Sequence, residues 1–126
     1  HPNIMATRFD YLRIAKAIMD DYQNGTCVGK YLKEIYKRRI PKGSKEKEEP
    51  LFGRSKSYGG QFHMDFPGLK ENVVFGMSGY GGNVIAIDME NSRILVVNSL
   101  HYNNKKYKYN HKKLLYDVIK EGRWKL

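Results

Sequence analysis

The chain has 126 residues, of which 40% are hydrophobic and 13% aromatic, so it has the size and composition of one folded domain or a piece of one. Lys and Arg number 23 against 13 Asp and Glu, which gives a formal net charge of +10. The single cysteine, Cys27, excludes an internal disulfide framework and a cysteine-based metal site, and no apolar run reaches the ~18 residues of a membrane span.

The first 40 residues predict two helices. Thr7 is a candidate N-cap with Asp10 three residues later, and apolar residues then recur at helical spacing to residue 23. The expected apolar face is made of Phe9, Leu12, Ile14, Ala15, Ile18, Met19 and Tyr22. Asn24-Gly25 ends this helix, and a second one is expected from about Thr26 to Arg39, closed by Pro41.

Residues 41–57 are polar and dense in charges of both signs, which predicts a solvated loop. The period then changes to that of strands, expected at 58–66, 72–77, 83–88 and 93–99, with a hairpin loop at 89–92. The apolar run 94–97 is typical of a strand buried on both faces. A polar turn at 101–110 precedes a helix from about His111 to Glu121, stopped by Gly122.

These elements predict an α+β fold in one segment, 1–126. It has a helical part (1–40), a charged loop (41–57), and a sheet with a C-terminal helix (58–126). We expect an antiparallel sheet of three to four strands, with the two N-terminal helices and the C-terminal helix packed on it.

The run Phe75–Asp88 places four glycines and one serine within eight residues and then continues as an apolar strand. Glycine lets other groups approach the backbone closely, so a hydroxyl among glycines suggests a strand edge that binds something. It is not a nucleophile elbow, because Tyr80 stands where the last glycine should be and no helix follows. It is not a dinucleotide fingerprint either, because Val84 stands where glycine or alanine is needed.

His63 and Asp65 alternate on an expected strand, so they should face the same side and could share a metal or a proton. No third ligand is in evidence near them. The sequence therefore favours a surface pair there and no metal site.

Several stretches together resemble a known family: Met5–Arg13, Asn24-Gly25, Tyr58-Gly59-Gly60, Met77–Asn83, Ile85–Asp88 and Arg93–Ser99. From Met5 onward the chain resembles the C-terminal part of the serine β-lactamase and penicillin-binding-protein-like superfamily, nearest its β-lactamase-related branch. The resemblance implies part of a β-lactamase/DD-peptidase-like fold. It also implies hydrolysis of an ester, amide or peptide bond through an acyl-enzyme, without a cofactor.

In that family a Lys/His-Thr/Ser-Gly motif lies on the strand beside the nucleophile, and Ser78-Gly79 matches its second and third positions. The resemblance implies that Ser78 offers its hydroxyl to a substrate carboxylate or carbonyl and that the N–H of Tyr80 is an oxyanion donor. Met77 departs from the pattern, with a thioether where a cationic or imidazole side chain is usual. The implied substrate-binding residues are Met77, Ser78, Gly79 and Tyr80.

The family's Ser-x-x-Lys nucleophile motif is not found in a suitable place. Ser44 and Lys47 have the spacing, but they lie in the charged loop rather than at the start of a buried helix. The nucleophile is therefore expected upstream, in a missing N-terminal part of the same domain, and the isolated chain is expected to be inactive. The expected partners are an acyl substrate and that N-terminal part.

An alternative reading is a non-enzymatic basic module that binds nucleic acid or another anionic partner. It is suggested by the charge of +10 and by ten tyrosines that could stack on bases. The positive charge is dispersed along the chain, which disfavours a nucleic-acid footprint. A pseudoenzyme that keeps the fold for partner binding is a further alternative, which Met77 favours.

Overall fold

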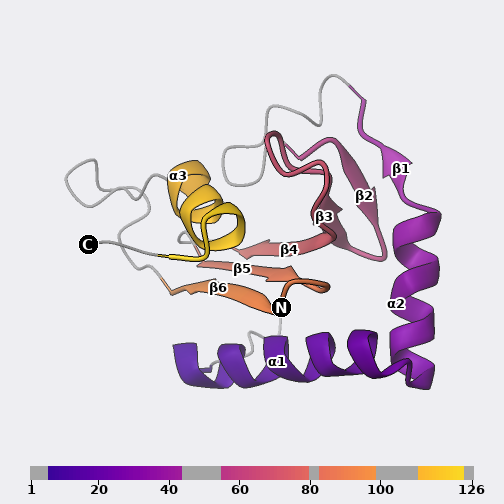
Figure 1. Cartoon of the computed structure of the whole chain (residues 1–126), viewed down its shortest axis with the longest axis horizontal. Coiled ribbons are helices and arrows are strands. Elements are labelled where there is room, and N and C mark those ends of the chain that lie inside the picture. Colours follow the sequence, from indigo (N-terminus) through magenta and orange to yellow (C-terminus); the bar gives the residue numbers. More distant parts are fainter. Residues whose placement is uncertain (1–5, 44–54, 80–82, 99–110, 124–126) are drawn as a thin grey trace.

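The computed structural model describes residues 6–43, 55–79, 83–98 and 111–123. In these residues three helices accompany one open antiparallel sheet of six strands, in the order β1-β2-β3-β4-β5-β6 (Figure 1). The elements are α1 (Arg8–Asn24), α2 (Cys27–Lys37), β1 (Ile40–Pro41), β2 (Ser57–Gly59), β3 (Phe62–Met64), β4 (Val74–Gly79), β5 (Asn83–Asp88), β6 (Arg93–Val97) and α3 (His111–Leu115), which continues as a π-helical turn, η3 (Tyr116–Lys120). The α+β class is confirmed.

Both N-terminal helices begin where their capping residues predict. The side chain of Thr7 accepts a hydrogen bond from the N–H of Asp10, whose carboxylate accepts one from the N–H of Thr7, so the capping box is complete. Gly25 follows α1 with a left-handed φ of 64°, and Thr26 caps α2. Because the turn between the two caps is so short, α2 leaves α1 at a steep angle (Figure 1).

The sheet has six strands rather than the expected three to four. Residues 58–66 do not form one strand: Gly60 and Gln61 both have positive φ and make the two-residue turn of a hairpin between β2 and β3. The short β1 then pairs with β2, with Ile40 opposite Tyr58. Pairing thus extends into both ends of the predicted loop 41–57, of which residues 44–54 lie outside the described part.

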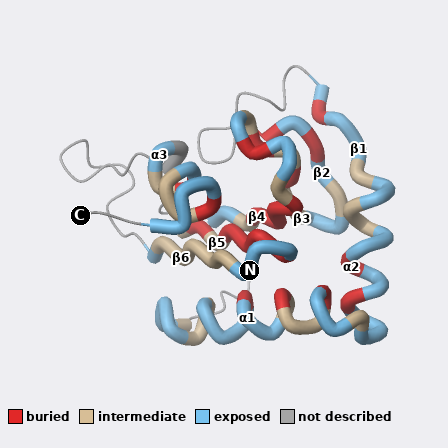
Figure 2. The backbone as a smooth tube through the Cα atoms, viewed as in Figure 1, coloured by how far each residue is buried: buried red, intermediate tan, exposed pale blue. Residues whose placement is uncertain are grey.

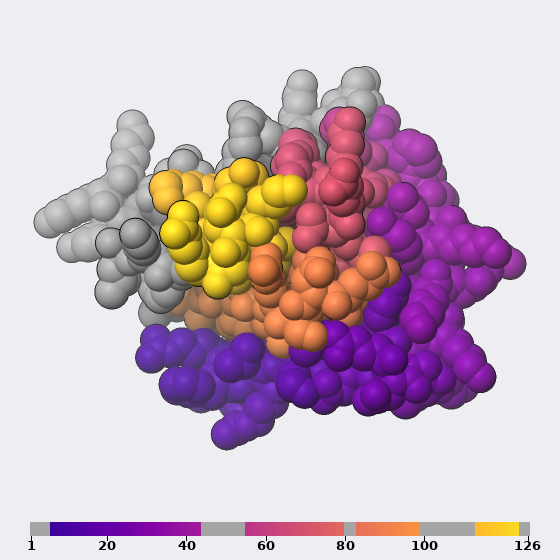
Figure 3. Space-filling model, in the orientation of Figure 1, coloured from indigo at the N-terminus to yellow at the C-terminus, as the bar shows by residue number. Residues whose placement is uncertain are grey.

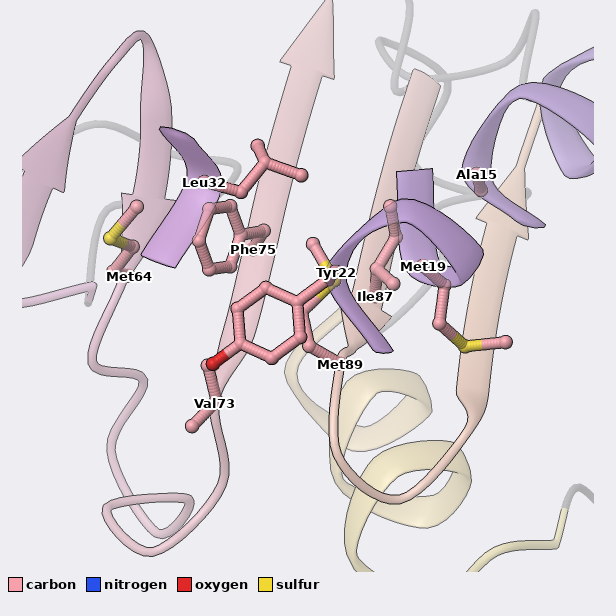
Figure 4. Close-up of a cluster of buried hydrophobic side chains, with 9 residues drawn as sticks. All are labelled: Ala15, Met19, Tyr22, Leu32, Met64, Val73, Phe75, Ile87 and Met89. Carbon is pink, nitrogen blue, oxygen red and sulfur yellow. The ribbon is translucent and has the colours of Figure 1, made fainter. Parts of the chain in front are cut away.

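One core lies between the sheet and the first two helices, and we call it the α1–α2 cluster. Its buried members are Ala15, Met19, Tyr22, Leu32, Met64, Val73, Phe75, Ile87 and Met89 (Figure 4). Phe75 is its centre, because the rings of Tyr22 and Phe62 meet it edge-on at 6.2 and 5.1 Å and that of Tyr36 stacks on it at 6.0 Å. Phe75 of β4 therefore contacts both helices.

A second core, the α3 cluster, lies on the opposite face of the sheet. Its buried members are Phe66, Leu69, Val74, Val84, Ala86, Leu115 and Ile119. Figure 3 shows the C-terminal helical segment lying against β5 and β6. Arg93 of β6 donates to the carbonyls of Ile119 and Lys120, at 2.7 and 3.0 Å, and so satisfies the end of η3.

The edge strand β6 differs from its prediction. All five of its residues are half-buried rather than buried (Figure 2). Helices cover both of its faces, since α1 and η3 both contact it, but within the described residues no strand pairs with its outer edge. The apolar run 94–97 therefore correctly indicated a strand with helices on both faces. It did not indicate that this strand lies at the edge of the sheet.

The apolar face predicted for α1 is wider than the face that is buried. Ala15, Met19 and Tyr22 are buried, whereas Phe9, Leu12 and Ile14 are exposed. Within the described residues, no helix is long and apolar enough to cross a membrane.

Candidate functional site

The end of β4 carries three of the four predicted site residues. Met77 is half-buried, and Ser78 and Gly79 are exposed. On one side β5 pairs with all six residues of β4, but on the other side β3 pairs with it only through His63 and Gly76. In the described part of the chain, the β4 backbone beyond Gly76 thus has a strand partner on one side only.

Alternation along β4 sends Met77 and Ser78 to opposite faces of the sheet. Met77 packs against the α1–α2 cluster together with its neighbour Phe75, whereas Ser78 shares the α3 face with Gly76. The thioether thus packs against the core. What this edge offers to a ligand is the Ser78 hydroxyl and the backbone; Tyr80 lies outside the described residues.

Gly79 leaves this edge open. Among the described residues, a Cβ built on it would meet only the Cβ of Asn83, at 3.9 Å, which is ordinary van der Waals contact. Gly79 is not among the described glycines with positive φ, so no turn requires a glycine here. Its effect is to leave space beside the backbone, which is what close approach of an extended ligand needs.

A second polar group, the Lys42 cluster, consists of Lys42, Ser55 and His63. The ammonium Nζ of Lys42 donates to Ser55 Oγ at 2.6 Å and lies 2.8 Å from His63 Nδ1, which is 3.2 Å from Ser55 Oγ. Lys42 and Ser55 are buried, and the ring of Tyr58 lies edge-on to His63 and beneath Lys42. A buried ammonium needs acceptors, and this cluster supplies two.

The expectation that His63 and Asp65 alternate on one strand is wrong. β3 ends at Met64, and Asp65 has a positive φ of 56°, so the strand alternation stops before it. The carboxylate of Asp65 instead accepts from Arg39 Nε at 2.5 Å and from the Ser57 hydroxyl. Burial raises the pKa of Asp65, but the hydrogen bonds from Arg39 and Ser57 outweigh it, so its pKa lies below the usual value.

The same hydrogen bond raises the pKa of Arg39, which therefore stays charged. No three His, Cys, Asp or Glu side chains in the described residues gather closely enough to hold a metal ion. The alternative nucleophile pair, Ser44 and Lys47, lies outside the described residues.

Sequence reasoning missed Lys42 and Ser55. They are 13 residues apart in a polar segment without periodicity, so nothing in their local pattern joins them. The sequence did hold a signal for the neighbouring strand pairing. Had Gly60-Gln61 been interpreted as a hairpin turn, the resulting register would have placed Tyr58 opposite His63 and Ser57 opposite Met64, near Asp65.

The chain matches no protein-family model, no curated protein and no solved structure.

Proposed function

We propose that this chain is the C-terminal segment of a serine β-lactamase-like hydrolase, and that it supplies a substrate-binding edge but not the nucleophile. The observation that carries the proposal is the end of β4. The Ser-Gly pair that resembles the family's motif is exposed there, on a strand paired by β5 and, beyond Gly76, by no other described strand. The two helices and the α3 segment on opposite faces of the sheet are compatible with part of a β-lactamase/DD-peptidase-like domain.

In this proposal an extended acyl substrate lies along the open side of β4, where backbone N–H and C=O groups can pair with it. The Ser78 hydroxyl donates to a carboxylate or carbonyl oxygen of the substrate. The N–H of Tyr80 is proposed as one of two donors to the oxyanion that forms when the carbonyl is attacked. A serine activated by a lysine, outside this chain, forms the acyl-enzyme, which water then hydrolyses.

The packing of Met77 favours a variant of this proposal, a pseudoenzyme that binds without turnover. The family's usual Lys or His at this position can carry charge or a proton, whereas Met77 packs against the α1–α2 cluster and can do neither. The variant keeps the edge of β4 as a binding surface. Turnover of an acyl substrate by the full-length protein would favour the hydrolase over the pseudoenzyme.

Binding to the isolated chain tests the edge. In an amide NMR titration with benzylpenicillin up to about 10 mM, we expect shifts at Met77, Ser78 and Gly79. Gly79→Val should abolish them by filling the open space beside the backbone, and Ser78→Ala should weaken them. Asn98→Ala, an exposed change beyond β6, is the matched control and should leave them intact.

Two outcomes would contradict the proposal. One is the absence of any shift at these three amides, or shifts that persist in Gly79→Val. The other is hydrolysis of nitrocefin or a p-nitrophenyl ester by the isolated chain that is lost in Ser44→Ala, because the nucleophile would then lie in this chain.

A further inference from the structure

The Lys42 cluster joins three short strands that are neighbours in the sheet. Lys42 follows β1, Ser55 precedes β2, and His63 is the middle residue of β3. The backbone continues the pairing there, since the N–H of Lys42 donates to the carbonyl of Lys56 at 2.9 Å and that of Lys56 to Asp65 at 3.0 Å. The side chains of the cluster therefore cross-link the same strands as the sheet does.

With Lys42 as an ammonium, its contact with His63 determines which imidazole nitrogen carries the proton. An ammonium group has donors and no lone pair, so at 2.8 Å it must donate to Nδ1 of His63. Nδ1 is then the acceptor, the ring is neutral, and its proton is on Nε2. A protonated ring has no acceptor nitrogen, and it would place a second cation 2.8 Å from the first.

We propose that Lys42, Ser55 and His63 form a proton-sensitive latch that fastens β1 to the β2–β3 hairpin. The latch is closed while neutral His63 accepts from Lys42, and protonation of the ring opens it. β1 is suited to respond, because it has two residues and, among the strands of the described residues, pairs with β2 alone, so few backbone hydrogen bonds hold it without the latch. This proposal is independent of the proposed function.

The groups that face the ring have unequal roles. Of the described residues, the Lys42 ammonium and the Ser55 hydroxyl contact Nδ1, and the Tyr58 ring lies edge-on to the imidazole. Two residues beyond His63, the Asp65 carboxylate accepts hydrogen bonds from Arg39, which follows α2, and from Ser57 of β2. The Lys56 side chain, between Ser55 and Ser57, is exposed, and β4 presents Gly76, which has no titratable group.

The direction of the pH response follows from this geometry. The closed latch binds no proton on Nδ1, whereas a histidine in the open or unfolded chain takes one as pH falls below about 6.5. The open form therefore gains protons on acidification and the closed form does not, so the closed form loses stability as pH falls. Above about pH 6.5 the contribution of the latch is complete.

NMR of the chain between pH 8 and pH 5 tests the latch. At pH 8, the imidazole nitrogen shifts of His63 should show Nε2 protonated and Nδ1 bare. On acidification, the ring signals should move at a lower pH than those of an exposed histidine, and the amides of Ile40, Lys42 and Lys56 should move with them. Far-UV circular dichroism over the same range separates local opening from global unfolding.

Substitutions test which side chains cause the pH response of the β1 amides. His63→Gln keeps an acceptor but cannot titrate, so the step in the Ile40 and Lys42 amides should vanish. Lys42→Met removes the cation, and the ring should then titrate about one pH unit higher. Lys56→Met, an exposed neighbour, is the matched control and should change neither.

The wild-type protein alone can overturn the proposal, whether or not the variants fold. Three results would each refute the latch. The first is a proton on Nδ1 at pH 8, and the second is a His63 ring that titrates at or above the pH of an exposed histidine. The third is that the amide signals of β1 do not change while His63 titrates. A step that survives in His63→Gln would assign the response to another group and refute it as well.

Discussion

At the scale of single residues, two neighbouring glycines have different roles. Gly29 lies in α2 against the end of α1, and a Cβ there would be 1.8 Å from the backbone oxygen of Asp21. Gly25 has a φ of +64°, and no atom of the described residues lies within 4 Å of a built Cβ. One glycine is needed for close helix contact, and the other for its backbone conformation.

Substituting each glycine with alanine separates these roles. Helix propensity alone favours Gly29→Ala by about 1 kcal/mol, but the clash with backbone should dominate and cost about 3 kcal/mol or more. Gly25→Ala should cost about 1 kcal/mol, from the left-handed conformation alone. Urea unfolding of both variants measures the difference. Equal stabilities, or a Gly29→Ala protein as stable as the wild type, would mean that α1 and α2 do not cross as closely as described.

Only some residues of the candidate site could be predicted from the sequence. The glycines around Ser78 identify an open strand end, because that is what glycine and an exposed hydroxyl in a strand imply. The opposite orientations of Met77 and Ser78 also follow from strand alternation. Lys42 and Ser55 were missed because their contact depends on the pairing of β1, β2 and β3, of which the Gly60-Gln61 turn indicates only the β2–β3 part.

At the scale of elements, an ion pair joins α2 to the sheet. Arg39 follows α2, lies over the ring of Tyr36 at 4.1 Å, donates to the carbonyl of Tyr36, and pairs with Asp65 after β3. Its side chain and that of Asp65 are only 30% and 26% exposed. By contrast, the Arg38–Glu34 pair one residue earlier is largely exposed, at 79% and 48%.

Two arginine variants test this link. Because Arg39 satisfies a half-buried carboxylate, Arg39→Met should cost about 1–3 kcal/mol at pH 7. Arg38→Met, the matched control, should cost less than about 0.5 kcal/mol. The pKa of Asp65 is lowered in the folded state, so its contribution is complete above the unfolded value of about 3.9 and is lost as pH falls through the folded value.

The stability gap between wild type and Arg39→Met should therefore narrow below about pH 4, as chemical unfolding at pH 7, 4 and 2.5 would measure. A gap that stays constant to pH 2.5 would show that Arg39 stabilises through its contact with Tyr36 and not through Asp65.

Elements with local signals were predicted well, and elements defined by their partners were not. Thr7, Gly25 and Thr26 specify helix ends through bonds within a few residues, so the helices could be read directly. β1 has two residues, and only its pairing with β2 makes it a strand. The β2–β3 turn was hidden because Gln61, not a glycine, occupies its second left-handed position.

At the scale of the whole molecule, part of the positive charge of the described residues is paired with carboxylates. Four exposed cations are each paired with a carboxylate three or four residues away in the chain: Arg13 with Asp10, Lys16 with Asp20, Arg38 with Glu34, and Lys113 with Asp117. Such pairs contribute little to stability, but they cancel the local field that an anionic partner would meet. Lys30 and Lys37 on α2 are exposed, and no ion pair of theirs is found among the described residues.

This distribution predicts weak nucleic-acid binding despite the net charge of +10. Fluorescence anisotropy with a labelled single-stranded oligonucleotide should show no saturable binding below about 100 μM protein at 150 mM salt, because dispersed, paired cations release few counterions. Binding that appears only at about 20 mM salt would agree with this expectation. Micromolar binding at 150 mM salt, lost in Lys30→Glu/Lys37→Glu but kept in the α1 control Lys16→Glu, would instead identify α2 as an anion-binding face. The basic-module function would then replace the hydrolase proposal.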